Sequence, residues 1–227
     1  SAENVTLFVQ VYLDITPKAY NSGEKTFTLD ITPMSRIVAS TKDVKDSDDL
    51  VIQGEQEAEG TPNAVVVGKP KELDITDTVE MTIQLPSAFS GVTTAYVVHT
   101  KEDRTQYLYD GQVANNVLTF TNPNGFSDFT VYGTDPAVAR VYESADATSP
   151  STGYMTLQQA VDAVAKSGFG YIVAKKDGSA KVSDVIDFTV KAEEGAKVSI
   201  TAGRGYVMEK EEQDDGTVLY SFSKSNL

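Results

Sequence analysis

The chain has 227 residues, enough for one large domain or two modest ones, and its 40% of hydrophobic residues indicates a globular rather than a disordered protein. With 33 acidic and 19 basic side chains, its net charge is −14, which disfavours nucleic acid and anionic membranes as partners. Cysteine is absent, which excludes disulfides, thiolate metal sites and cysteine nucleophiles. No stretch approaches the ~18 apolar residues of a membrane helix, so we expect no membrane insertion in this segment.

The first 135 residues predict one strand after another. Apolar and polar residues alternate in several runs rich in Val, Ile, Thr, Tyr and Phe, and turn residues separate these runs. The runs are Val5–Ile15, Thr26–Ile31, Val79–Leu85, Thr94–Thr100, Val117–Thr121 and Phe129–Gly133. Short strands at this spacing predict an antiparallel β-sandwich of the Ig-like type over residues 1–138.

The tetrapeptide LDIT occurs three times in this region, at 13–16, 29–32 and 73–76. Leu and Ile, two residues apart, share one face of a strand, and Asp and Thr share the other. The first two copies flank the turn "NSGE" and are therefore expected to form a long hairpin. Because proline cannot donate to a ladder, Pro17 and Pro33 are expected to end these two strands. One carboxylate per copy is too few for a calcium loop.

Three side chains in the strand region are candidates for a site. His99, the only histidine, is expected on the solvent side of its strand. In "QYLYDG", Tyr107 and Tyr109 share one strand face and form a candidate ligand face, because aromatic rings on a sheet can stack on sugars. The alternative places both rings in the core or in cross-strand pairs. Glycan binding requires both rings to be exposed and Leu108 to point into the core.

Other motifs give no catalytic, cofactor-binding or metal residues. The aspartate-rich segment 42–50 lacks the central Gly and the closing Glu of an EF-hand, so we expect a solvated loop, with calcium binding left open. The Gly-x-Gly at Gly168–Gly170 follows an expected helix and precedes a strand, the reverse of the order in a dinucleotide fold. No nucleophile–base pair or phosphate loop is visible, so we expect no enzyme activity and no cofactor.

After Asp135-Pro136 the pattern changes. Residues 156–167 predict the one convincing helix, with apolar residues at i, i+3, i+4, i+7 and i+8 from Leu157. Thr156 and Gln159 match a capping box, and Gly168 matches a left-handed stop. Strands follow, ending in a hairpin over 206–223. The sequence thus predicts a smaller α+β module over 139–227, divided from the sandwich near 134–139, where most of the acidic excess also ends.

Two stretches resemble modules of large secreted or cell-surface proteins of Gram-positive gut bacteria. Residues 79–133, with "LP" at 85–86 and "GFSDFTVYG" at 125–133, look like a sandwich segment of such proteins. Residues 139–227, with "ARVYE" and "GYMTLQQAVDAV", are similar to modules of the "TLQEAVDA" type, which often begin a β-solenoid. Whether a solenoid begins here stays open, because the residues after the helix depart from the usual pattern.

The resemblance implies a non-catalytic display or adhesion segment of a larger bacterial surface protein, extracellular or on the cell surface, with signal and anchor outside this chain. The expected partner is a host or cell-wall ligand, for which a glycan is one candidate. The alternative is an accessory, carbohydrate-binding region of a secreted polysaccharide-degrading enzyme that has its catalytic domain elsewhere.

Overall fold

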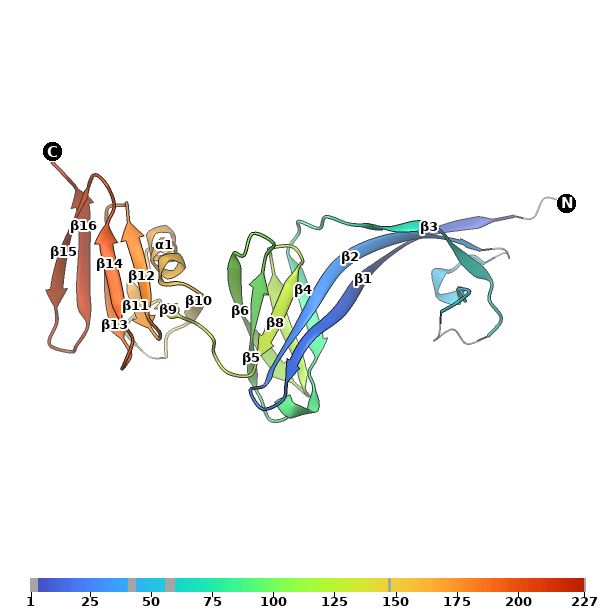
Figure 1. Ribbon diagram of the computed structural model, residues 1–227, viewed down its shortest axis with the longest axis horizontal. Helices are drawn as coiled ribbons and strands as arrows, with labels where there is room; N and C mark the ends of the chain where they lie inside the picture. Colours follow the sequence, from blue (N-terminus) through green and yellow to red (C-terminus); the bar gives the residue numbers. More distant parts are fainter. Residues whose placement is uncertain (1–3, 41–43, 56–59, 147, 227) are drawn as a thin grey trace.

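The computed structural model describes residues 4–40, 44–55, 60–146 and 148–226. The fold is mainly β, with one α-helix, and Figure 1 shows an elongated molecule whose N- and C-termini lie at opposite ends. The strands of the first sheet are β1 (Thr6–Asn21), β2 (Thr26–Ser40), β3 (Ala64–Glu72), β4 (Val79–Gln84), β5 (Thr94–Thr100), β6 (Gln106–Ala114), β7 (Val117–Asn122) and β8 (Asp128–Tyr132). The later elements are β9 (Ala139–Tyr142), β10 (Ser151–Tyr154), α1 (Leu157–Ser167), β11 (Tyr171–Ala174), β12 (Gly178–Val182), β13 (Ile186–Ala192), β14 (Val198–Ala202), β15 (Tyr206–Glu212) and β16 (Val218–Lys224).

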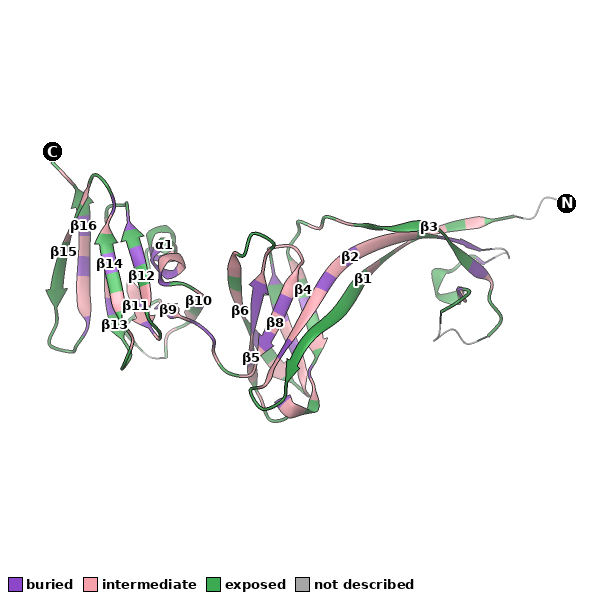
Figure 2. Ribbon diagram, viewed as in Figure 1, coloured by how far each residue is buried: buried purple, intermediate pink, exposed green. Residues whose placement is uncertain are grey.

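The first eight strands form one curled antiparallel sheet in the order β1-β2-β8-β5-β6-β7-β4, with β3 also paired to β2. The curl lets apolar side chains of β2, β5 and β8 meet those of β4 and β7. Phe89, Phe129 and Leu118 are fully buried in this core. Figure 2 shows the buried positions concentrated in the middle of these strands. Alternation in the sequence therefore does produce one buried face, as expected for half-buried strands.

The predicted hairpin is confirmed, and its two LDIT segments pair with each other. Asp14 lies opposite Thr32, and Ile15 lies opposite Ile31. Two short helical turns of the 3-10 type, Ser47–Asp49 and Ser87–Phe89, lie in the connections outside the strands. The end of the hairpin away from its turn, together with β3, extends beyond the curled sheet (Figure 1). We call residues 5–15, 33–40 and 64–72 the arm.

The expectation that Pro17 and Pro33 end their strands is wrong. Pro17 lies inside β1, beside a register shift at an edge strand, where a missing N–H is tolerated. Pro33 lies in β2 between the part that pairs with β8 and the part that pairs with β3. The third LDIT, at 73–76, is not a strand; its Leu73 N–H donates to the carbonyl of Pro33 at 2.9 Å. The tetrapeptide is thus a strand pattern in two of its three copies.

The second part of the fold combines a six-stranded sheet, in the order β10-β9-β11-β13-β16-β15, with the two-stranded sheet β12-β14. A second hydrophobic core joins both sheets to the apolar face of α1. β11 pairs in parallel with β13, and β12 pairs in parallel with β14. The segment β11–β12 and the segment β13–β14 therefore stack as two successive turns, in the manner of the first turns of a solenoid. β16 then pairs antiparallel with β13, and the hairpin β15–β16 therefore occupies the edge on which a third turn would stack.

The predicted helix is confirmed. Of the two hydrogen bonds of the predicted capping box, only the one to the Thr156 side chain is formed. The hydroxyl of Thr156 accepts the backbone N–H of Gln159 at 3.0 Å, and Gly168 ends the helix at a φ of 74°. The side chain of Gln159 does not return to the cap. Its Nε2 donates instead to the carbonyl of Gln106 on β6, at 2.8 Å, and so links the helix to the first sheet.

Candidate functional site

The two candidate tyrosines lie on the same face of β6 but in different surroundings. Tyr107 remains 37% exposed. Tyr109 is half-buried, with its ring stacked on Phe120 at a centroid distance of 5.9 Å. Burial is the main cause that raises the pKa of Tyr109 to about 12. A platform of two exposed rings is therefore not formed; Tyr107 alone offers a ring to solvent.

His99 explains why Tyr109 is held inward. The side chain of His99 is fully buried, so the expectation of a solvent-facing histidine is wrong. Its Nδ1 lies 2.9 Å from the hydroxyl of Tyr109, and its Nε2 lies 2.7 Å from the hydroxyl of Ser127. The ring also stacks on Phe129 at 4.1 Å between centroids. Burial first, and Lys101 second, lower the pKa of His99 to about 4, so the imidazole is neutral at neutral pH.

The neighbouring hydrogen bonds determine which nitrogen carries the proton. The hydroxyl of Ser127 donates to the carbonyl of Thr100 at 2.8 Å, so it must accept from His99, and the proton is on Nε2. Nδ1 then accepts from Tyr109, whose oxygen in turn accepts from Asn124 at 2.8 Å. Because His99 donates to Ser127, it cannot act as a base on that hydroxyl in this arrangement. The chain of hydrogen bonds satisfies every polar atom of a buried histidine.

A groove lies between the first sheet and the helix-containing part, with Tyr107 on its wall. Its volume is about 370 Å³. It is lined by Gln106, Tyr107, Leu108 and Tyr109 of β6, by Thr152, Gly153 and Tyr154, and by Gln159, Asp162, Ala163 and Lys166 of α1. Leu108 does not point into the core of the curled sheet: a Cβ added at Gly153 would lie 2.6 Å from its Cδ2, so Leu108 contacts β10. Because side chains alternate along β6, the ring of Tyr107 lies on the face opposite to Leu108, with its centroid 6.4 Å from that of His99, and α1 does not surround it.

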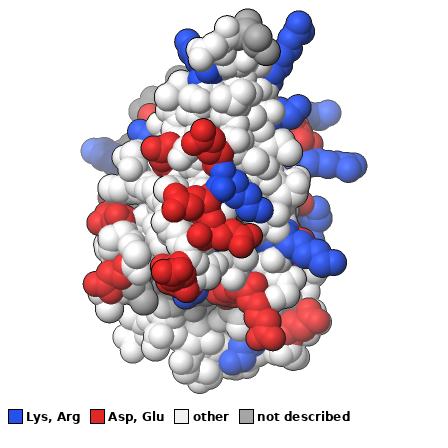
Figure 3. Space-filling model, turned by 90° about the vertical axis from the view of Figure 1, so that its left-hand side faces the viewer, with Lys and Arg blue, Asp and Glu red and all other residues white. Residues whose placement is uncertain are grey.

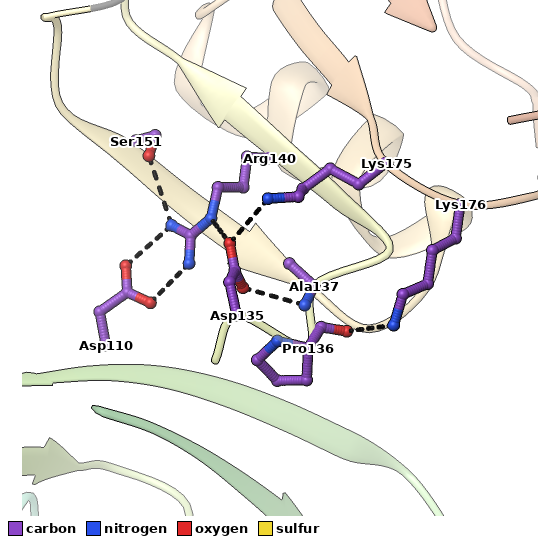
Figure 4. A network of polar contacts seen from close by, with 8 residues as sticks. All are labelled: Asp110, Asp135, Pro136, Ala137, Arg140, Ser151, Lys175 and Lys176. Atoms are coloured by element: carbon purple, nitrogen blue, oxygen red, sulfur yellow. Dashed lines mark hydrogen bonds and ion pairs between the residues drawn. The ribbon is translucent and has the colours of Figure 1, made fainter. Parts of the chain in front are cut away.

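Arg140 on β9 joins the two parts of the fold below this groove (Figure 4). Its Nη1 and Nη2 donate to the two carboxylate oxygens of Asp110 on β6, at 2.9 and 2.8 Å, and its Nε donates to Asp135 at 2.6 Å. The guanidinium also lies over the ring of Tyr96, 5.5 Å from its centroid. The fork of a guanidinium suits this bidentate geometry better than an ammonium would. We call Arg140, Asp110 and Asp135 the junction cluster.

Asp135 is the hub of the junction cluster. It accepts from the backbone N–H of Ala137 at 3.0 Å and pairs with Lys175 at 3.3 Å. Burial alone would raise the pKa of Asp135, but the hydrogen bonds from Arg140 and Ala137 outweigh it and the net pKa is lowered. For Arg140, burial disfavours the charge, and the hydrogen bonds to Asp110 and Asp135 outweigh it, so its pKa is raised. Asp135 and Arg140 thus stay ionised throughout the physiological pH range.

A second groove, of about 440 Å³, brings together the second and third LDIT segments. Its acidic lining residues are Asp30, Glu72, Asp74, Glu102 and Asp128. Within the described ranges, no group of three or more His, Cys, Asp or Glu side chains is arranged to hold a metal ion. Of the aspartate-rich segment 42–50, residues 42 and 43 lie outside the described residues. Asp46, Asp48 and Asp49 are exposed, and Asp46 caps the turn Ser47–Asp49.

Charge on the end of the molecule formed by β15 and β16 is mixed. Figure 3 shows acidic side chains gathered over the middle of this face, with lysine and arginine side chains projecting around them. No continuous basic patch is visible there. In the part of the chain that the structure describes, no helix has the length and apolarity needed to cross a bilayer.

The junction cluster is not predictable from the sequence, because Asp135, in the connection before β9, and Asp110, on β6, lie 5 and 30 residues from Arg140. The one available signal was an arginine at the start of an otherwise apolar strand, "ARVY". In comparisons with known proteins, no family model, no curated protein and no solved structure matches the chain.

Proposed function

We propose that the chain is a non-catalytic display or adhesion segment of a larger bacterial surface protein, located outside the cell or on its surface. The observation that carries the proposal is the elongated arrangement, with termini at opposite ends and a buried ion cluster fixing the junction between the two parts (Figures 1 and 4). A segment that presents other parts of a protein at a distance needs such an outline and a stiff junction. The similarity to modules of Gram-positive surface proteins points the same way.

Within this proposal, the curled sheet is an Ig-like sandwich, and the chain divides near 134–139 into units 1–138 and 139–227. In support, the two large hydrophobic cores share no residue. No strand of the first sheet pairs with a strand of the second among the described residues. Limited proteolysis near 134–139 should leave two fragments that each keep a cooperative melt. Loss of both melts after a single cut would contradict the division.

Adhesion is tested with the protein coupled to beads through its C-terminus. The beads should adhere to immobilised mucin or to purified cell wall, and beads carrying the heat-denatured protein should not. If the beads adhere to neither surface, the adhesion function is rejected and only the display function remains proposed. The complete reading frame separates display from the alternative: a sorting signal or further repeats supports display, whereas a glycosidase or lyase domain supports an accessory role.

The exposed ring of Tyr107 favours a second candidate function, a carbohydrate-binding accessory region in which this ring would stack on a sugar. A glycan array should show binding by the wild type, loss with Tyr107→Ala and no change with Tyr20→Ala, which removes an exposed tyrosine outside the groove. Equal signals for all three proteins would exclude Tyr107 as the sugar site.

A further inference from the structure

The arm carries a row of apolar side chains that no described residue covers. In the extended backbone from residue 5 to residue 15, every second side chain points to the same side. On that side the odd-numbered positions are all apolar and 44–74% exposed; they are Val5, Leu7, Val9, Val11, Leu13 and Ile15. Single exposed apolar residues are ordinary, but a contiguous row of them indicates an interaction site.

The row extends across the neighbouring strands. Val9 lies opposite Ile37 of β2, which lies opposite Val67 of β3. Both Ile37 and Val67 are exposed as well. We call this side of the arm the open face: the odd-numbered residues of 5–15, 35–39 and 65–67. None of these positions holds a charged residue, although the chain as a whole carries a net charge of −14.

The opposite side of the arm is covered only near the start of β1, where Phe8, Val38 and Ala64 pack with Leu50 and Ile52 of the β2–β3 connection in a small core. Further along, that side carries the polar side chains of Gln10, Asp14 and Arg36. The open face is therefore the more apolar side of the arm, although it is the exposed one. A sheet with one solvated face normally turns its apolar side to a covering layer. The sequence of the arm is thus suited to a layer on the open face that the described residues do not provide.

We propose that a second copy of this chain provides that layer, with the two open faces packed against each other about a two-fold axis. An uncharged sheet face offers nothing to an ionic ligand, and its complement is another apolar sheet face about 10 Å away. A two-fold axis supplies such a face, because an isologous interface uses the same patch on both subunits. The open face spans 11, 5 and 3 residues on its three strands, which at about 3.3 Å per residue and about 4.8 Å per strand gives about 300 Å² per copy. The pair buries about 600 Å², below the ~1,000 Å² of a stable specific interface, so only a weak dimer is expected.

Sedimentation velocity from low micromolar to submillimolar concentration tests the proposal. The wild type should show a reversible monomer–dimer equilibrium. The double variant Val9→Lys/Ile37→Lys places charge on the open face and should weaken association at least ~10-fold. The matched control Val185→Lys changes an equally exposed valine on the other part of the fold and should dimerise as the wild type does. Val9→Thr, which keeps a β-branched residue in the strand, should weaken association without affecting the fold.

Salt separates this apolar interface from an ionic one. Two chains of charge −14 repel each other, and salt screens that repulsion, so the dimer fraction should rise with ionic strength. A dimer that dissociates as salt is added would overturn the proposal.

Hydrogen exchange separates face packing from pairing along the free edge of β1. Edge pairing would protect the outward N–H groups of β1 in the dimer, whereas face packing leaves them exchanging. New protection along β1 would overturn the proposal in favour of edge pairing. A wild type that stays monomeric at every concentration would overturn it in favour of an occupant from another protein.

Discussion

The burial and protonation of His99 in the first sheet depend on hydrogen-bond partners that are distant in the sequence. His99 binds Tyr109, 10 residues on, and Ser127, 28 residues on. Its strand pattern, "TAYVVHT", places it opposite Tyr107 but does not reveal which side of the sheet is covered. The solvent-facing assignment failed for this reason: the curl of the sheet, which buries that side, is a property of eight strands and not of one.

The state of His99 can be observed directly, because the chain contains a single histidine. Its folded-state pKa of about 4 lies below the unfolded value of 6.5. Between these values the unfolded chain binds more protons, so the contribution of His99 to stability is present above pH 6.5 and is lost as the pH falls through about 4. The full contribution is about 3 kcal/mol at most. An NMR titration should show a neutral ring with the proton on Nε2 at pH 6; a midpoint near 6.5 would contradict the buried network.

The two tyrosines of β6 provide a matched pair for stability. Tyr109→Ala removes a half-buried ring and a hydroxyl that both His99 and Asn124 use, so it should cost about 3–5 kcal/mol. Tyr107→Ala removes a partly exposed ring and should cost less than about 1 kcal/mol. Urea denaturation of both variants measures the difference. Equal losses would mean that Tyr107 is also part of the core.

At the scale of elements, α1 could be predicted almost to the residue because its signals are local. The apolar stripe, the cap Thr156 and the stop Gly168 all lie within one stretch of 13 residues. The continuation of β1 through Pro17 and of β2 through Pro33 could not be predicted. A strand tolerates a proline only where no neighbouring strand needs its N–H, and the sequence does not show where that is. The third LDIT has the same local sequence as the first two but forms no strand, although its Leu73 N–H donates to Pro33 of β2. Strand formation is decided by pairing, and pairing is not local.

The cap of α1 gives a prediction at this scale. Thr156→Ala removes the acceptor of the Gln159 N–H and should cost about 1 kcal/mol, whereas Thr156→Ser keeps the hydroxyl and should cost little. Denaturation of both variants, followed by far-ultraviolet circular dichroism, measures the cost. Because the Gln159 side chain reaches Gln106, Gln159→Ala should leave the cap intact and weaken the contact between the helix and β6. A large loss of helix in Gln159→Ala would show that the contact and the cap are coupled.

At the scale of the whole molecule, the sequence predicted the mainly β composition, the hairpin and the helix, but not how the parts meet. The junction depends on Asp110 of β6, Asp135 before β9 and Arg140 of β9, and nothing in their spacing marks them as neighbours. Gly153 contributes by the absence of a side chain: a Cβ there would lie within about 3 Å of Leu108 and Arg140. Close approach of β10 to β6 therefore needs glycine at this position.

The junction cluster gives the prediction that bears most on the elongated form. Arg140→Ala leaves Asp135 half-buried with Lys175 as its remaining cation, and breaking a buried ion pair typically costs about 3–5 kcal/mol. Arg140→Lys keeps a charge but not the fork and should recover only part of the loss. Lys18→Ala, which breaks an exposed pair with Asp128, is the control and should leave the free energy of unfolding nearly unchanged.

Two measurements on these variants separate stability from shape. Urea denaturation gives the free energy of unfolding. Small-angle scattering under native conditions reports the distribution of pairwise distances within the molecule, whose long-distance part should broaden in Arg140→Ala and stay unchanged in Lys18→Ala. Broadening shows that the cluster sets the angle between the two parts. A less stable Arg140→Ala with an unchanged distribution would instead mean that other contacts, such as Gln159 with Gln106 and Leu108 with Gly153, hold the angle without it.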